Sequence, residues 1–372
     1  MAKLSLAELK SAVASYVDAS KIAVDSFSAT YNNVVGLLDK IGKIVTLDTG
    51  FYDKLPELEG DYLAEGKTVE EYYFDLIAAM DYNQDEDGSR AMKFWSPTHR
   101  PVAWSQTLGR KIIPISIPNN NIERAVNNMS QFVEIVAMLE KRLSDSKAMW
   151  KYGVKRQLLG TVLSKIDGAY SGATAYVDAT TDITEGTFYK QGSPAVTTVC
   201  VKAKTHAVGD TYATLQAGGY LIPINLAEEV AVPEDTSTGE AFIKAVRNAV
   251  EQSQDVSEGN SFNGNTIGAE EGLVLYVKQG ITSVLDVDTM AGAFHLDKIA
   301  LPVEIKVIKD FGNYSGKAYA LLADRRGVKL HLDYEAIREN FNGFGDFLSL
   351  YSHIESTGWI SRNAFFHAFL DD

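Results

Sequence analysis

The sequence has little of what marks several common classes of protein. It contains one cysteine, Cys200, among 372 residues, so a framework of intrachain disulfides is excluded. This absence fits folding in a reducing compartment. Basic residues are also scarce, because 35 lysines and arginines stand against 49 aspartates and glutamates, and the formal net charge is −14. Proteins that hold nucleic acid through its phosphates are basic, so the charge argues against that class.

Long hydrophobic runs are missing as well. No apolar stretch approaches the roughly 20 residues that a membrane-spanning helix needs. The N-terminal residues MAKLSLAELK contain no hydrophobic core of a signal peptide, so we expect synthesis in the cytoplasm. Hydrophobic residues make up 45% of the chain and charged residues 23%, which indicates an ordered globular protein with two or three domains.

The histidines do not form a pattern typical of metal ligands. No two of them lie within five residues of each other, and neither HExxH nor a His–Cys spacing occurs. The six positions are His99, His206, His295, His331, His353 and His367. The sequence therefore predicts no zinc site.

The acidic stretch DYNQDEDG (81–88) resembles the start of a calcium-binding loop, because acidic or amide residues alternate from Asp81 to Asp87. An EF-hand loop needs Gly at its sixth position and a bidentate Glu at its twelfth. Those positions hold Glu86 and Met92 here. We favour a solvated acidic loop, and a calcium site is the alternative.

Motifs of catalysis are incomplete. GNYSGK (312–317) resembles part of a phosphate-binding P-loop, but three residues separate its glycines instead of four, and Ala318 stands where Ser or Thr is needed. No GxSxG occurs, and no GxGxxG follows a predicted strand. ADRRG (323–327) sets Asp324 beside two arginines, but paired charges at the end of a strand are usually structural. We predict no catalytic residue, no bound cofactor and no metal.

Helical periodicity is strongest at 121–143. Apolar residues recur there at steps of four and three, which places them on one face of a helix roughly 33 Å long. They are Ala125, Met129, Phe132, Val136, Leu139 and Leu143. We expect the polar residues 144–146 to interrupt this helix and a second periodic stretch to continue to Ile166.

The N-terminal third of the chain has mixed character. It predicts helices at 5–25 and 31–41 and a strand at 44–48. Residues 51–117 predict little regular structure apart from a short helix at 68–80, and such a stretch is too long for an ordinary loop. We interpret it as an extended hairpin-like arm that buries its apolar residues on a neighbouring chain.

The rest of the chain predicts strands and one more helix. A strand is expected at 195–204, a helix at 239–252, and buried strands at LVLYV, VEIKVI and AYALLA. Residues 347–370 alternate as two or three long strands. The expected class is α+β, mostly antiparallel, with one long helix across a sheet.

Four stretches resemble the major capsid proteins of tailed bacteriophages, and among them those of the short-tailed picovirus group. They are VVGLLDKIGKIV (34–45), GKTVEEYYFDLI (66–77), VLDVDTMAGAFHL (284–296) and the run from ADRRG to FHAFL (323–370). The last two are the most specific. The resemblance covers nearly everything from Tyr31 to Leu370 and is weak between Gly168 and Ser237.

This resemblance implies an α+β Hong Kong 97-type capsid fold. That fold has a long spine helix over a β-sheet, an extended β-hairpin loop and an axial α/β domain. Residues 1–52 would then be an N-terminal arm, 53–117 the extended loop and 118–237 the peripheral domain with the spine helix. Residues 238–345 would form the axial domain, and 346–372 would be C-terminal strands returning to the peripheral domain.

The function that the resemblance implies is structural, and no enzyme activity is expected. A major capsid protein self-assembles into pentamers and hexamers that form an icosahedral or prolate shell around a double-stranded DNA genome. A shell of negatively charged subunits would not hold the phosphates of the DNA tightly, so the DNA would stay free to move. The alternative with the same fold is an encapsulin-like nanocompartment shell. An enzyme and a calcium-dependent surface protein are further alternatives.

The partners implied are copies of the chain itself, a scaffolding protein during assembly and a portal protein at one vertex. The DNA would be enclosed without sequence-specific binding, and no membrane is involved. The expected location is the virion, assembled in the cytoplasm of the host bacterium. The chain ends at Asp372 without the immunoglobulin-like domain of some members. Residues 1–30 are short for a built-in scaffold, so a separate scaffolding protein is expected.

Aromatic and basic residues directly follow the acidic stretch. Because aromatic side chains and arginine concentrate in the cores of interfaces, Trp95, His99, Arg100 and Trp104 are predicted inter-subunit contacts. The alternative is that the two tryptophans only hold the arm together.

Overall fold

The computed structural model describes most of the chain after residue 50. The described residues are 51–63, 69, 71–74, 99–101, 103–118, 129–192, 195–254, 256–267, 269, 272–281, 303–345 and 347–371. The predicted helices at 5–25 and 31–41 and the predicted strand at 44–48 lie outside them.

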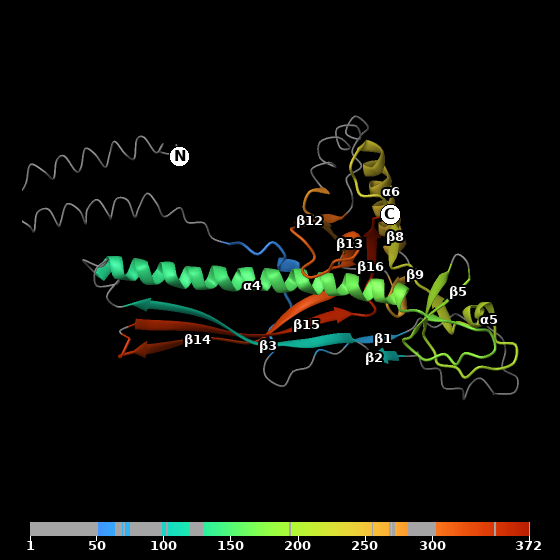
Figure 1. Ribbon diagram of the computed structural model, residues 1–372, viewed down its shortest axis with the longest axis horizontal. Helices are drawn as coiled ribbons and strands as arrows, with labels where there is room; N and C mark the ends of the chain where they lie inside the picture. Colours follow the sequence, from blue (N-terminus) through green and yellow to red (C-terminus); the bar gives the residue numbers. More distant parts are fainter. Residues whose placement is uncertain are drawn as a thin grey trace, which may run out of the picture. The chain divides into compact units, whose positions relative to one another are not determined.

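The longest described element is the helix α4 (Met129–Ser171), with 43 residues (Figure 1). The prediction of a long helix is confirmed, but the predicted interruption at 144–146 is wrong. Ser146 donates its hydroxyl hydrogen bond to the carbonyl of Arg142 one turn earlier, at 2.7 Å. A serine that bonds to its own helix in this way stays inside it. The two periodic stretches of the sequence are therefore one rod.

A five-stranded sheet lies against α4. Its strands are, in spatial order, β12 (Glu304–Ile308), β11 (Leu273–Lys278), β13 (Ala318–Asp324), β16 (Phe366–Leu370) and β8 (Ala227–Glu229). β12 runs parallel to β11 and β8 runs parallel to β16, while the central pairs are antiparallel. The predicted strands LVLYV, VEIKVI and AYALLA are confirmed as β11, β12 and β13.

The two faces of this sheet are covered by different helices. Side chains of successive strand residues alternate between faces. Leu275 and Val277 belong to one core with Phe242 of α6 (Thr236–Ser253), and Val274 and Tyr276 belong to another core with residues of α4. The predicted helix at 239–252 is thus confirmed as α6, and the α+β class is confirmed.

A second, antiparallel sheet carries the long strands. It consists of β14 (Val328–Asn342), β15 (Phe347–Ser361) and β3 (Ala103–Pro118), with β15 in the middle, and all three contact α4. β1 (Tyr72–Phe74) pairs with β2 (His99–Pro101) just before β3 begins. The predicted helix at 68–80 is therefore wrong at 72–74. Its run of aromatic residues favours a strand once a partner strand is present.

Residues 174–223 form a small unit with its own core. Four strands, β4 (Thr174–Ala175), β5 (Phe188–Gln191), β6 (Val196–Cys200) and β7 (Leu221–Pro223), form its sheet beside the helix α5 (Tyr212–Ala217). The core consists of Tyr176, Ile183, Tyr189, Cys200, Tyr212, Leu215 and Leu221. The strand predicted at 195–204 is confirmed as β6, which is shorter. A hairpin of β9 (Val256–Ser261) and β10 (Gly264–Ile267) follows α6.

Strand pairing groups parts of the chain differently from the predicted domain borders. Residues 328–342, predicted as axial, pair with β15 in the sheet that also holds β3. β8 and β16 join the five-stranded sheet, although they were predicted within the peripheral domain and its returning strands. The borders followed the order of the sequence, whereas sheet membership depends on pairing between distant residues. The domain division itself stays a prediction.

The helices of the described residues do not include a membrane span. α4 is long, but charged residues recur along it, and no described helix is sufficiently apolar over the length that a bilayer requires.

A close approach of α4 to the turn after β12 provides a test of this packing. A Cβ atom added at Gly160 would lie 2.0 Å from the carbonyl oxygen of Phe311. We expect Gly160→Ala to lower the free energy of unfolding by about 2 kcal/mol, because overpacking outweighs the better helix propensity of alanine. Urea denaturation measures this change.

The matched control is Gly153→Ala on the same helix. A Cβ atom added at Gly153 meets nothing within 4 Å. We therefore expect a gain of up to about 1 kcal/mol from helix propensity alone. Equal effects of the two substitutions would show that the approach at Gly160 is not tight.

Candidate functional site

The P-loop-like sequence 312–317 is a packing turn between β12 and β13. Gly312 has a φ of +64°, and a Cβ atom there would lie 2.9 Å from the Cα of Gln157 in α4. Glycine is needed at this position for its backbone conformation and for the approach of the helix. The turn therefore serves packing and does not cradle a phosphate.

The ADRRG sequence forms the turn from β13 to β14. The buried carboxylate of Asp324 accepts a hydrogen bond from the backbone N–H of Arg326 at 2.8 Å, and it pairs with the guanidinium of the same residue at 3.1 Å. Asp324 and Arg326 thus pair within the turn, whereas Arg325 pairs with Glu304 of β12.

A strap of residues 52–63 crosses α4 and contains η1 (Pro56–Leu58). Leu55 and Leu58 are fully buried in the main core. The side chain of Lys155 in α4 is also fully buried, and its Nζ lies 2.5 Å from Oδ2 of Asp53 and 2.8 Å from the carbonyl oxygen of Leu55. A buried charge of this kind is stable only with such partners. The strap is therefore held by both apolar and ionic contacts.

Further contacts attach the strap to α4 and to β14. Glu59 forms a β-bridge to Leu330 of β14, and its carboxylate pairs with Lys151 of α4 at 2.5 Å. Burial raises the pKa of the Glu59 carboxyl, but Lys151 and Lys155 outweigh burial, and the net pKa lies below its ordinary value. Lys329 of β14 donates to the carbonyl of Glu57 at 2.9 Å. The strap thus fastens α4 to β14.

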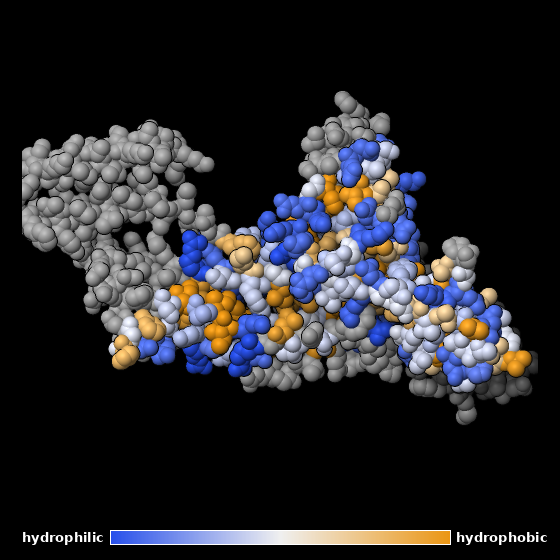
Figure 2. Space-filling model, in the orientation of Figure 1, coloured by the Kyte–Doolittle hydropathy of each residue, from blue (hydrophilic) through white to orange (hydrophobic). Residues whose placement is uncertain are grey.

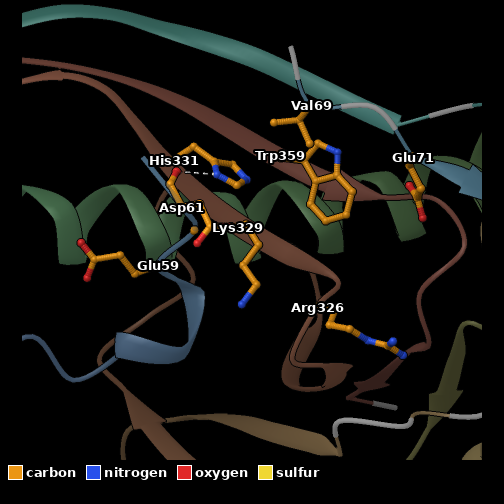
Figure 3. A pocket seen from close by; sticks show the side chains of 9 residues that line it. Glu59, Asp61, Val69, Glu71, Arg326, Lys329, His331 and Trp359 are labelled. Atoms are coloured by element: carbon orange, nitrogen blue, oxygen red, sulfur yellow. Dashed lines mark hydrogen bonds between the residues drawn. The ribbon is translucent and has the colours of Figure 1, made fainter. Parts of the chain in front are cut away.

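A cavity of about 490 Å³ adjoins the strap (Figure 3). The ring of His331 lies against Gly60, where a Cβ atom would come within 2.5 Å of it, and its Nδ1 lies 2.9 Å from the carbonyl oxygen of Asp61. The lining residues are Glu59, Gly60, Asp61, Val69, Glu71, Arg326, Lys329, His331 and Trp359. None of them is Ser, Thr or Cys, so the lining of this cavity offers no hydroxyl or thiol nucleophile.

The free end of the β14–β15 hairpin presents an unburied aromatic residue. In the turn, Oδ1 of Asn342 accepts hydrogen bonds from the backbone N–H groups of Phe344 and Gly345, both at 3.1 Å. The side chain of Phe344 is completely exposed, at 105%. Figure 2 shows hydrophobic atoms at this end of the hairpin. Burial of a phenylalanine contributes about 1.5–3 kcal/mol, so Phe344 is a candidate contact for another molecule.

Exposed isoleucines extend this apolar surface along the same sheet. Ile337 of β14 is 58% exposed and Ile112 of β3 is 53% exposed. They lie on opposite faces, because Ile337 pairs with Ser352 of β15 and Ile112 pairs with the next residue, His353. Both faces of this part of the sheet thus offer apolar side chains.

The predicted contact residues are only partly described. Trp95 lies outside the described residues, as does the acidic stretch 81–88. His99 and Arg100 lie in β2, opposite β1, and Trp104 lies in β3, opposite Ile360. His99 and Arg100 thus belong to the two-stranded sheet, and Trp104 belongs to the three-stranded sheet. Their role in contacts stays a prediction.

The sequence patterns did not reveal the strap or the exposed position of Phe344. Glycines on both sides of Phe344, between two strand-like stretches, are a hairpin-turn signal that could have identified the tip. The strap has no such signal, because its partners in α4 lie about a hundred positions away.

Comparison with solved structures shows the same fold in phage capsids. The capsid structure of Staphylococcus phage Andhra matches with a TM-score of 0.59 and 11% identity, covering 88% of this chain and 86% of that chain. A structure of head fiber and inner core protein gp22 of bacteriophage P68 matches with a TM-score of 0.57 and 10% identity, covering 88% and 87%. The capsid structure of Cyanophage P-SCSP1u matches with a TM-score of 0.50 and 9% identity, covering 88% and 90%. The predicted Hong Kong 97-type fold is confirmed.

Comparison with sequences gives the family. A search of curated proteins finds no match. The family model of the Phi29-like phage major capsid protein matches residues 3–370. This match covers almost the entire chain, it favours a capsid shell over an encapsulin-like compartment, and it confirms that the protein is structural and not an enzyme. The chain belongs to the family of Phi29-like phage major capsid proteins.

Proposed function

We propose that copies of this chain assemble head to tail into pentamers and hexamers, which close into an icosahedral or prolate shell around double-stranded DNA. The observation that carries the proposal is the family match over residues 3–370. Head-to-tail contacts form rings when the rotation closes, and both ring sizes then use the same surfaces. The exposed Phe344 supplies an apolar contact of the kind that such a surface needs.

The proposed arm extends from the short β1–β2 ladder. Phe74 and His99 are its last register partners, and β2 leads directly toward β3. Phe74 and His99 thus form the end of the β1–β2 ladder that is farther from β3. The chain between these two residues starts and finishes at that end. We assign this arm, together with the residues directly after it, to the surface of the next subunit, with Trp95, His99, Arg100 and Trp104 as contacts.

Other partners follow from charge and from the proposed shell. The net charge of −14 supports a wall that encloses DNA without binding it tightly. A scaffolding protein would guide closure, and a portal protein would occupy one vertex. Assembly would take place in the cytoplasm of the host bacterium. The domain division into arm, extended loop, peripheral and axial parts belongs to the same proposal.

Electron microscopy of the purified chain tests this function. The chain is produced alone and together with the proteins encoded beside it, and both preparations are imaged in negative stain. We expect closed, uniform particles in the second preparation and rings or irregular shells in the first. A stable monomer in both preparations would contradict the proposal.

The role of the arm has its own test, in which Asn-Gly replaces residues 75–98. Because Phe74 and His99 are register partners, a two-residue turn joins β1 to β2 without disturbing the ladder. We expect the shortened chain to fold and to form no closed particles in the same imaging experiment. Normal particles from this variant would show that the arm is not an assembly element.

A further inference from the structure

His367 of β16 is a buried histidine, and one of its two ring nitrogens makes no hydrogen bond with the described residues. Its side chain is 2% exposed. Nδ1 lies 3.2 Å from the carbonyl oxygen of Asn225, which also accepts a hydrogen bond from Nδ2 of Asn260 at 2.7 Å. A carbonyl oxygen accepts only, so in the tautomer that makes this bond Nδ1 carries the proton and Nε2 presents a lone pair. Nε2 has no hydrogen-bond partner among the described residues.

The lone pair of His367 faces a carboxylate. Oε2 of Glu228 in β8 lies 3.6 Å from Nε2, which is too long for a hydrogen bond. The side chain of Glu228 is 47% exposed, so it reaches solvent while the histidine does not.

These two side chains line a small polar cavity of about 250 Å³ between β8, β16 and α6. Amide side chains line the rest of it, and Oε1 of Gln252 is already oriented by Nδ2 of Asn225 at 3.3 Å. The lining residues are Asn225, Ala227, Glu228, Asn248, Ala249, Gln252 and His367. No lysine or arginine is among them, so no cation of the described lining neutralises Glu228.

We propose that His367 and Glu228 bind a divalent transition-metal ion in this cavity, with Zn²⁺ as the best-matched ion. Imidazole nitrogen and carboxylate oxygen are both ordinary zinc ligands at about 2.1 Å. Two such ligands lie between about 3.0 Å and about 4.2 Å apart for angles from about 90° to about 180° at the metal. The observed 3.6 Å falls within this interval.

The surroundings of His367 match those of a metal-binding histidine. Such a residue donates its other ring N–H to a backbone carbonyl or a carboxylate, which fixes the tautomer and the orientation of the ring. The carbonyl of Asn225 does this here. A water molecule takes about 30 Å³ of liquid volume, so the cavity also holds the waters that complete the coordination.

The sequence predicted no metal site because the two ligands lie in different strands. β16 pairs in parallel with β8, and Phe369 is the register partner of Glu228, which brings His367, two residues before Phe369, to the same face of the sheet as Glu228. Among the described residues no group of three or more His, Cys, Asp or Glu side chains has metal-binding geometry. The site therefore has two protein ligands of these types and takes its remaining ligands from amide oxygens and water.

Binding at this place has a structural consequence. β8 has three residues and lies at the end of the five-stranded sheet, where its one partner among the described strands is β16. An ion shared by Glu228 and His367 adds a second link between these strands beside α6 (Figure 1). Occupancy then stabilises the native state by mass action.

Calorimetric titration of the full chain with ZnCl₂ at pH 7 tests the site. The informative variant is Glu228→Gln, which preserves shape and changes an exposed side chain. Its matched control is Glu229→Gln, the next residue in β8. We expect one ion per chain in the native protein and in Glu229→Gln, and an affinity at least about tenfold lower in Glu228→Gln. MgCl₂ should produce no comparable heat, because Mg²⁺ prefers oxygen ligands.

Two results would overturn the proposal. One is the absence of saturable binding in the native protein, and the other is an equal affinity in Glu228→Gln. Either would leave His367 and Glu228 as an ion pair only. A second histidine–carboxylate pair, His206 and Asp182 at 2.7 Å on the surface, does not confuse the test, because Glu228→Gln leaves it intact. Thermal unfolding provides a separate readout, since ZnCl₂ should raise Tm in the native protein and not in Glu228→Gln.

Discussion

Phe344→Ser is expected to leave the fold of the chain intact and to abolish most of its assembly. The side chain of Phe344 is completely exposed, so its removal takes no packing from the subunit. The turn that carries it depends on Oδ1 of Asn342 and on backbone N–H groups, none of which the substitution removes. The free energy of unfolding should therefore change by less than about 0.5 kcal/mol.

The loss of assembly follows from the position of the side chain. A buried aromatic anchor contributes about 2 kcal/mol or more to an interface, which is roughly a 30-fold change in affinity for each contact. The concentration at which particles form should rise at least about 30-fold, because every contact in the shell is weakened. Light scattering during assembly measures this concentration, and electron microscopy identifies the products.

Two variants control for general effects of surface change. Val208→Ser removes another fully exposed apolar side chain, at 104%, from a turn of the small unit that contains β6. We expect normal assembly there, because the proposal assigns no contact to Val208. Phe344→Leu keeps an apolar side chain and should recover part of the assembly. Normal particles from Phe344→Ser would show that the tip of the β14–β15 hairpin is not a contact between subunits.

Local sequence patterns predicted the elements that depend on local chemistry. β11 and β13 were recognised because their residues are continuously apolar, and both strands lie between two layers of helix. α6 was recognised from its periodicity. The same reasoning failed at 144–146, because the effect of a serine depends on which carbonyl its hydroxyl reaches. It also failed at 72–74, where a strand depends on partners 25 to 29 positions later.

Functional surfaces were less predictable, because they depend on residues that the fold brings together. Asp53 and Lys155 are 102 positions apart, and Glu228 and His367 lie in two different strands. Neither pair has a spacing that a sequence motif could reveal. The family resemblance predicted the fold and the function, but it did not indicate the strap, the hairpin tip or the cavity beside α6.

The strap leads to the second large prediction, which concerns Lys155. The side chain of Lys155 is fully buried, and Nζ lies 2.5 Å from Oδ2 of Asp53, 2.8 Å from the carbonyl oxygen of Leu55 and 3.8 Å from Oε2 of Glu59. Lys155→Met keeps the length of the side chain but leaves a carboxylate and a carbonyl facing an apolar group. Removing one partner of a buried ion pair costs about 3–5 kcal/mol. We expect the free energy of unfolding to fall by about 3 kcal/mol, because Asp53 retains some solvent contact.

A surface ion pair of the same helix is the matched control. Lys147 pairs with Glu335, and both side chains are partly exposed. Because solvent screens such pairs, Lys147→Met should lower the free energy of unfolding by less than about 1 kcal/mol. Urea denaturation of the unassembled chain measures both variants. Limited proteolysis should cleave Lys155→Met first in the strap, since the ion pair between Asp53 and Lys155, which holds the strap on α4, is lost.

Asp53→Asn combined with Lys155→Met separates the ion pair from simple loss of packing. If the cost arises from an uncompensated carboxylate, the neutral amide removes that charge, and the double variant should be more stable than Lys155→Met alone by about 1 kcal/mol or more. If the loss of stability in Lys155→Met arises only from poor packing of methionine, adding Asp53→Asn should not raise the free energy of unfolding. Recovery would show that charge at Lys155 holds the strap to α4, beside the contact of the strap with β14.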